Sequence, residues 1–216
     1  MHIDIVADVA CPWCFIGKRR LERALALRPD IVATWSWRAF QLNPDLPGGG
    51  IPRDFFLAAK FGDMRQAVRS ETAIAATGRA EGIDFAFERI RRTPNTLRAH
   101  RLIRLAAAAG RGDALAEALF RAYFTQGIDI GDIGALAIIA ERGGIDRGLA
   151  AAYLESEAGT VEILAEDRRA RRLGIHAVPC FVIERGYAIS GAQEPEMLLP
   201  LLDLAAGIGN PAAGQA

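Results

Sequence analysis

The chain has 216 residues, of which 51% are apolar and 24% charged, and its 26 basic and 26 acidic side chains cancel. This composition is typical of a globular protein with a sizeable core, and the balanced charge disfavours a nucleic acid or an anionic membrane as partner. The N-terminus has no basic segment before a long apolar run, and the longest apolar runs are far shorter than the roughly 20 residues that cross a bilayer. We therefore expect a cytoplasmic protein with no membrane partner.

The first elements are predicted to be a strand and a helix. The segment Ile3–Val9 alternates between apolar and polar residues, which fits a short, largely buried strand. The period then changes, because Cys14, Leu21 and Leu25 fall on one face of a helix. Pro12 stands in the first turn of this helix, where its missing N–H costs nothing.

A second strand should follow at residues 31–42 (IVATWSWRAFQL), which are rich in aromatic and β-branched side chains. A strand, a helix and a strand within about forty residues are the order of a βαβ unit. Residues 43–52 (NPDLPGGGIP) contain three prolines and three glycines, so they are predicted to form a loop.

Helical periodicity dominates from Arg53 to about Ser156, and we expect several helices there without a strand. The clearest helix lies in RRTPNTLRAHRLIRLAAAAG, where Thr93 or Asn95 caps the start and Gly110 the end. Another helix is expected in TVEILAEDRRARRLGI. The last elements are a hairpin of strands 180–184 and 187–190, with a tight turn between them, and a helix over 194–206.

Without the central helices, the predicted order is that of a thioredoxin fold. We therefore expect an α/β protein in which a large all-helical insertion separates a βαβ half from a C-terminal αββα half. Residues 1–44 and 158–206 would form the thioredoxin-like domain, 45–157 the insertion and 207–216 a flexible tail.

The strongest functional signal is CPWC, residues 11–14. Residues three apart on a helix share a face, so Cys11 and Cys14 can form a disulfide. Cys11 lies at the helix N-terminus, where unpaired N–H groups and the macrodipole favour a thiolate, whereas Cys14 continues the buried face. Because the thiolate is the nucleophile, Cys11 is predicted to attack a substrate disulfide and Cys14 to resolve the mixed disulfide.

Several further stretches resemble one known family: WRAFQLNPD, PNTLRAHRL, ALFRAYFTQGIDI, LGIHAVPCFVI and YAISGAQ. Together with CPWC, they are similar to the DsbA-like thioredoxin-fold oxidoreductases, in particular the cytoplasmic FrnE-like subgroup, over about residues 3–203. The resemblance implies a catalytic cysteine pair facing a cis-proline at Pro179. The backbone of Val178 would then pair with an extended substrate, and Pro12 and Trp13 would lie beside it.

Two residues depart from the family pattern. Ala177 stands where a glycine is usual, and Cys180 where a bulky apolar residue is usual. Cys180 would bring a third thiol close to Cys11. We favour a buried small hydrophobe at this position over a site of regulatory oxidation or an alternative disulfide partner.

Two other chemistries stay open. The 2-hydroxychromene-2-carboxylate isomerases and kappa-class glutathione transferases have a similar layout but typically place a serine where Cys11 stands. Asn43, Asn95 and the pair Ser190-Gly191 nevertheless match stretches where those relatives hold glutathione or a substrate. His176 and Cys180 could complete a Cys3His zinc set with the pair, but these ligands would come from separate elements rather than a short knuckle.

His100 lies on a helix of the insertion, and a lone histidine is more often a packing residue than a base. A proton carrier near a thiol would nevertheless be useful, so His100, Asn95 and Cys180 are accessory candidates. We expect no metal and no nucleotide cofactor. The expected partners are protein or small-molecule disulfides, with glutathione or another dithiol as redox partner, for a monomer or homodimer.

Overall fold

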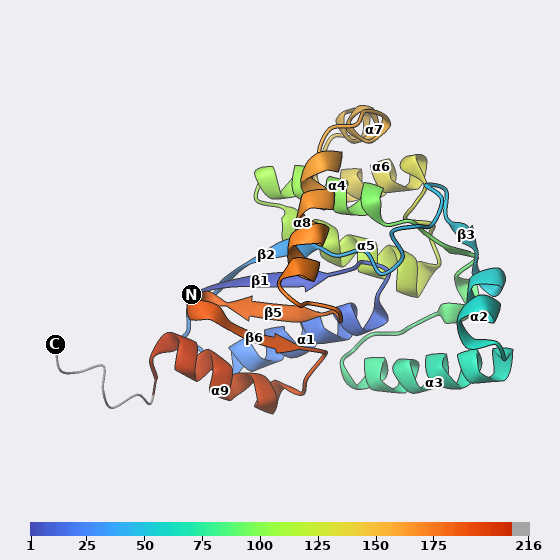
Figure 1. The fold of residues 1–216 in the computed structure, drawn as a ribbon. Helices are drawn as coiled ribbons and strands as arrows, with labels where there is room; N and C mark the ends of the chain where they lie inside the picture. Colours follow the sequence, from blue (N-terminus) through green and yellow to red (C-terminus); the bar gives the residue numbers. More distant parts are fainter. Residues whose placement is uncertain (209–216) are drawn as a thin grey trace.

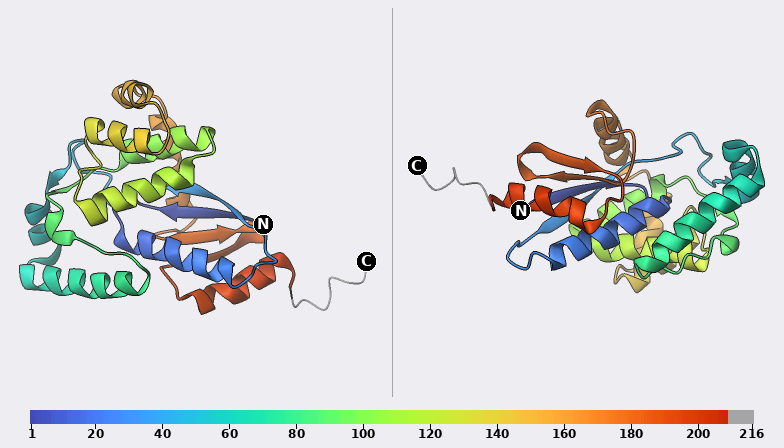
Figure 2. Two further views of the ribbon diagram at one scale, coloured as in Figure 1. Left: turned by 180° about the vertical axis from the view of Figure 1, so that it is seen from behind. Right: turned by 90° about the horizontal axis from the view of Figure 1, so that it is seen from below.

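The computed structural model describes residues 1–208, in which a four-stranded sheet has helices on both faces (Figure 1). The strand order is β2-β1-β5-β6, with β1 and β2 parallel and the other neighbours antiparallel. The elements of this part are β1 (His2–Ala7), α1 (Pro12–Ala26), β2 (Thr34–Ala39), β5 (Cys180–Ile183), β6 (Tyr187–Ser190) and α9 (Pro195–Ala206). Helices α1 and α9 cover one face, as the view from below shows (Figure 2).

The segment between β2 and β5 is mostly helical, which confirms the predicted thioredoxin-like fold with a helical insertion. Its helices are α2 (Arg53–Phe61), α3 (Met64–Ala80), α4 (Leu97–Ala108), α5 (Gly112–Gln126), α6 (Ile133–Arg142), α7 (Arg147–Glu155) and α8 (Thr160–Arg172), with a 3-10 turn at Phe87–Arg89. Helix α8 lies across the second face of the sheet, α4–α7 lie beyond β2, and α2–α3 extend to one side (Figures 1 and 2).

The insertion is not all-helical, and this part of the prediction was wrong. Strands β3 (Ile51–Pro52) and β4 (Arg92–Thr93) form a short antiparallel ladder that ties the loop after β2 to the start of α4. Two-residue strands are too short to show an alternating pattern, and the partner residues lie far apart in the sequence.

The second strand is shorter than predicted, because only Thr34–Ala39 pair with β1 in register. Beyond it, the backbone N–H of Gln41 binds a carboxylate oxygen of Asp167, and that of Leu42 binds Asp8. These residues are therefore held by side chains rather than by the sheet. The predicted flexible tail falls largely on residues 209–216, which lie outside the described part of the chain.

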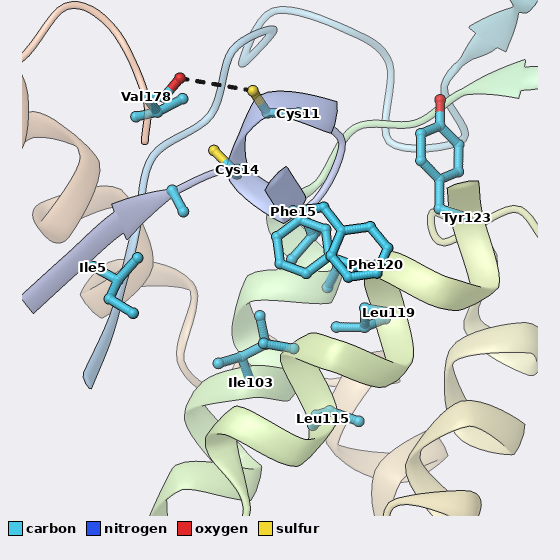
Figure 3. Packing of buried hydrophobic residues seen from close by; sticks show 14 of the residues in the cluster. Ile5, Cys11, Cys14, Phe15, Ile103, Leu115, Leu119, Phe120, Tyr123 and Val178 are labelled. Atoms are coloured by element: carbon cyan, nitrogen blue, oxygen red, sulfur yellow. Dashed lines mark hydrogen bonds between the residues drawn. The ribbon is translucent and has the colours of Figure 1, made fainter. Parts of the chain in front are cut away.

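The main core lies between α1, α4, α5 and the sheet (Figure 3). Phe15 of α1 stacks on Phe120 of α5 with ring centroids 5.1 Å apart, and Phe124 continues the row. Phe120 is fully buried, so the insertion completes the core of the thioredoxin-like part instead of only covering it. Within residues 1–208, no helix is long and apolar enough to cross a bilayer.

Candidate functional site

The cysteine pair lies where β1 ends and α1 begins. Cys11 is the N-cap of α1, with φ −97° and ψ 114°, and Pro12 is its first helical residue, so the helix starts at the predicted place. The backbone N–H of Cys11 donates to the carbonyl of Asp8 at 3.0 Å and closes the turn that leads into the helix. All three cysteines of the chain are free thiols.

The two thiols differ in environment. The Sγ of Cys11 is 3.7 Å from the carbonyl oxygen of Val178 and donates to it (Figure 3). Cys14 is 1% exposed against 5% for Cys11. Burial raises the pKa of Cys14 well above its ordinary value, and the adjacent Cys11 side chain raises that pKa further through a hydrogen bond and its charge. The Cys14 thiol is therefore held in its protonated form.

The loop before β5 faces this pair. The peptide bond between Val178 and Pro179 is cis, which confirms the expected geometry. Gly17 of α1 allows the loop to lie this close, because a Cβ at Gly17 would be 2.7 Å from Cγ of Pro179 and 3.3 Å from Cζ of Phe181. A side chain at residue 17 would therefore push the loop away from the helix that carries the cysteines.

The two residues between the cysteines, Pro12 and Trp13, lie in the first turn of α1. Pro12 begins the helix and Trp13 is 40% exposed, so the indole presents a large apolar surface next to the buried thiols. An exposed aromatic side chain of this size is suited to contact a bound chain.

Asp8 is a site residue that the sequence pattern did not single out. It is 1% exposed, and its carboxylate accepts hydrogen bonds from the backbone N–H groups of Ala10 at 3.1 Å and Leu42 at 2.7 Å. In the sequence, Asp8 reads as one of the polar residues of the first strand. The available signal was its position just before a loop that enters a helix, where aspartate commonly binds the backbone two residues ahead.

His100 reaches this carboxylate from α4. Its Nε2 lies 3.6 Å from Oδ1 of Asp8, and the imidazole is 5% exposed. The expected packing role describes its burial, but the ring also faces a buried acid next to the cysteine pair.

The recorded hydrogen bonds of Asn95 are structural and join the loop after β2 to the start of α4. Its amide donates to the carbonyl of Leu46 at 2.7 Å and that of Pro44 at 3.3 Å, while its oxygen accepts from the N–H of Leu97 at 3.0 Å. These bonds hold the loop after β2 against the start of α4.

The side chain of Cys180 points to the opposite face of the sheet from Phe181 and α1. Phe181 contacts Gly17 of α1, and side chains of adjacent strand residues point to opposite faces. Cys180 pairs with Val6 in the sheet, so its side chain is directed away from α1. The alternation of β5 thus directs the Cys180 side chain to the face of the sheet opposite α1, and its proximity to Cys11 stays a prediction. His176 is exposed, and the described residues contain no cluster of three or more His, Cys, Asp or Glu that could hold a metal.

Comparison with known families decides the broader identity. Residues 2–203 match the model of the DSBA-like thioredoxin domain. The chain belongs to this family. A probable DsbA oxidoreductase from Streptomyces coelicolor is 34% identical, with a TM-score of 0.88 over 98% of this chain and 92% of that chain.

Two further relatives are more distant. The uncharacterized protein YwbO of Bacillus subtilis (strain 168) is 27% identical over 184 residues, which are 85% of this chain and 86% of that protein. A 2-hydroxychromene-2-carboxylate isomerase has a TM-score of 0.69 at 19% identity over 96% of this chain and 95% of that chain, a likeness of fold.

Proposed function

We propose that this DSBA-like protein is a thiol-disulfide oxidoreductase that exchanges disulfides through Cys11 and Cys14. The observation that best supports this proposal is that the two cysteines lie in different environments. Cys11 caps the N-terminus of α1, whereas burial raises the pKa of Cys14 and keeps its thiol protonated. In the proposed cycle, the Cys11 thiolate attacks the substrate disulfide, and Cys14 then attacks Cys11 to release the reduced substrate. The enzyme cycles between dithiol and disulfide.

The substrate site is proposed to lie around Trp13 and the loop at Val178 and Pro179. The exposed indole supports this placement, as does the contact between Cys11 and the carbonyl of Val178. An extended disulfide-containing segment could pair with the Val178 backbone while its apolar side chains lie against Trp13. Protein disulfides and small disulfides are both substrates of this chemistry, with glutathione or another dithiol as redox partner.

The FrnE-like subgroup and a cytoplasmic location are part of the proposal. A reducing compartment keeps such a pair mostly as dithiol, so reduction or isomerisation of substrate disulfides is the favoured direction. No metal is needed for this chemistry, because the two cysteine sulfur atoms themselves give up the two electrons that reduce the substrate disulfide.

The test is to equilibrate the protein in glutathione buffers of stepped potential, alkylate free thiols and measure intact mass. A single two-electron transition is expected in wild type, lost in Cys11→Ser and retained in the control Cys180→Ser. Cys14→Ser should accumulate a mixed disulfide with glutathione. A wild type that formed no internal disulfide, or retained one bound glutathione, would instead favour a glutathione-dependent isomerase or transferase.

A further inference from the structure

Strand β2 lies at an edge of the sheet and pairs with β1 alone. The backbone N–H groups of Thr34 and Phe40 donate to carbonyl oxygens at the two ends of β1, at 3.0 and 3.1 Å. Backbone groups of successive strand residues alternate in direction, so the N–H and C=O groups of Trp35, Trp37 and Ala39 face away from β1. Three residues of β2 therefore present hydrogen-bonding groups at the open edge.

One of these outward groups already has a side-chain partner. The N–H of Ala39 donates to the carboxylate of Glu166 in α8 at 2.9 Å. Within residues 1–208, no hydrogen bond is recorded for the backbone N–H of Trp35 or Trp37. An unpaired strand edge is a template for a further extended chain. The middle of β2 therefore offers two pairing positions.

A cavity of about 490 Å³ lies beside this edge, and we call it the β2 groove. Residues of β2 and α4 line it, together with residues of α8 and of the start of α5, and α4 lies beyond β2 in Figure 1. The part of the lining around the end of α4 consists of small residues, namely Ala107, Ala108, Gly110 and Gly112. Such residues allow another backbone to approach closely.

The side chains of β2 hold the edge in place. The indole N–H groups of Trp35 and Trp37 both donate to Oδ1 of Asp113 in α5, at 2.8 and 3.1 Å. Nζ of the buried Lys18 in α1 lies 3.5 Å from the other oxygen of the same carboxylate. These contacts fix the strand to α5 and α1 in the free protein. A chain that binds along β2 would therefore need little ordering of the protein.

The charges at the rim of the β2 groove favour an acidic ligand. Arg38 and Arg104 share the carboxylate of Glu166, and each lies 4.0 Å from its Oε1, the outer limit of an ion pair. Arg38 also binds Asp4 at 2.7 Å. For Arg104, whose side chain is 46% exposed, no hydrogen bond is recorded within residues 1–208. Its guanidinium donors are therefore available to an added carboxylate.

We propose that the β2 groove binds an extended peptide segment that carries an acidic residue. The peptide backbone pairs with the outward groups of Trp35 and Trp37 and adds a strand to the sheet, while its carboxylate binds Arg104. The site uses neither cysteine, so it goes beyond the proposed disulfide exchange. It holds a segment of a protein partner away from the disulfide.

An unfolded segment fits the β2 groove better than the edge of a second folded copy. Helix α8 contacts β2 on one face and α5 on the other, and α4 lies beyond the edge, so the groove is walled by helices. The β2 strand of a second copy is enclosed by the same helices, which would collide before the two strands met. A single extended chain has no such obstruction.

The experiment measures amide hydrogen exchange by NMR in the reduced protein with and without a cysteine-free peptide, acetyl-VTVEVT-amide. A matched peptide, methylated on every internal backbone nitrogen, keeps the side chains but cannot donate hydrogen bonds. The N–H of Ser36 faces β1 and serves as the internal reference for Trp35 and Trp37. The variant Ala108→Phe fills the groove, and Ala109→Phe is the control, since Ala109 is equally exposed but is not part of the lining.

With the peptide at about twenty times its Kd, exchange at Trp35 and Trp37 should slow roughly twentyfold, because only the free protein exchanges. Exchange at Ser36 should not change. The methylated peptide should bind roughly tenfold more weakly or worse, since it loses at least two backbone hydrogen bonds. Ala108→Phe should weaken binding of the unmodified peptide to a similar extent, whereas Ala109→Phe should bind like wild type.

A second comparison tests the charge contact. Replacing the glutamate of the peptide by glutamine should weaken binding roughly two- to fivefold, the size of an exposed ion pair. In Arg104→Gln the two peptides should bind equally. A preference for the acidic peptide that persists in Arg104→Gln would contradict the assigned contact.

The strand pairing is overturned if the peptide does not slow exchange at Trp35 and Trp37, or if the methylated peptide binds equally well. Slow exchange that depends on protein concentration without peptide would assign the edge to a second copy and also overturn the proposal. If Ala108→Phe does not fold, the two peptides compared on wild type decide. The redox titration in glutathione buffers tests the cysteines separately, so either proposal can fail alone.

Discussion

The helices around the cysteine pair and the helices at the side of the molecule are packed very differently. Helices α1 and α5 each bury eight of fifteen residues, whereas α3 buries two of seventeen. In α2 and α3, Phe55, Met64 and Val68 are exposed apolar side chains. The insertion therefore consists of two regions that are packed differently. Helices α4 and α5 complete the core and supply His100, while α2 and α3 expose apolar side chains to solvent. Substitutions in the two regions should have effects of very different size.

The largest effect on stability is expected for Phe120→Ala. Phe120 is fully buried and packs against Phe15, Phe124 and Trp37, so its removal leaves a cavity between α1 and α5. The free energy of unfolding should fall by about 3–5 kcal/mol, measured by urea denaturation of the reduced protein. The matched control is Phe55→Ala, because the side chain of Phe55 is 64% exposed. This substitution should change the free energy of unfolding by less than about 0.5 kcal/mol. Equal losses in the two variants would contradict the difference in packing.

A smaller effect is expected for Gly17→Ala, which adds a methyl group between α1 and Pro179. Its Cβ would lie 2.7 Å from the proline ring, so overpacking should cost about 1–3 kcal/mol despite the better helix propensity of alanine. The displaced loop should also slow disulfide exchange. Gly134→Ala in α6 is the control, because an added Cβ there approaches only the Asp132 side chain at 3.3 Å, and it should be neutral or slightly stabilising. A stabilised and fully active Gly17→Ala would show that the close approach is not needed.

The periodicity and the cysteine pair made most of this architecture predictable. The order of strands and helices, the start of α1 at CPWC and the C-terminal hairpin follow from local patterns, which a single sequence contains. The cis-proline at residue 179 came from the family resemblance, because few X-Pro bonds are cis. The direction of Cys180 depends on which face of β5 is covered by α1, which the alternation alone does not say.

The contacts that were missed all join distant segments. Asp8 follows β1 and His100 lies in α4, and the tight contact at Gly17 depends on the position of the loop before β5. The β3–β4 ladder likewise pairs residues from the two ends of the α2–α3 segment. Such contacts depend on how distant segments pack in three dimensions. Neither the helix and strand propensities of the residues nor the hydrophobic periodicity of the sequence predicts them.

The buried Cys14 thiol predicts how the stability of the reduced protein depends on pH. Because the folded state raises the pKa of Cys14, the fold favours the neutral thiol. This contribution is fully present below the pKa of the unfolded chain, about 8.5, and is lost as the pH rises toward the folded value. The free energy of unfolding should fall above about pH 8.5, by at most about 1.4 kcal/mol per pH unit from this group. Urea denaturation of Cys14→Ala should show a weaker fall, and an identical one would assign the effect to other groups.

The smallest effect is expected on α3, for Val68→Ser. Val68 is 57% exposed, so replacing it should change the free energy of unfolding by less than about 0.5 kcal/mol and leave disulfide exchange unchanged. Ala67, the adjacent residue, is fully buried, and Ala67→Ser is the comparison that should be costly. A large loss for Val68→Ser would mean that the exposed side chains of α2 and α3 are covered in solution. Unfolding measured over a range of protein concentrations would then show whether a second copy covers them, because only an oligomer becomes more stable as its concentration rises.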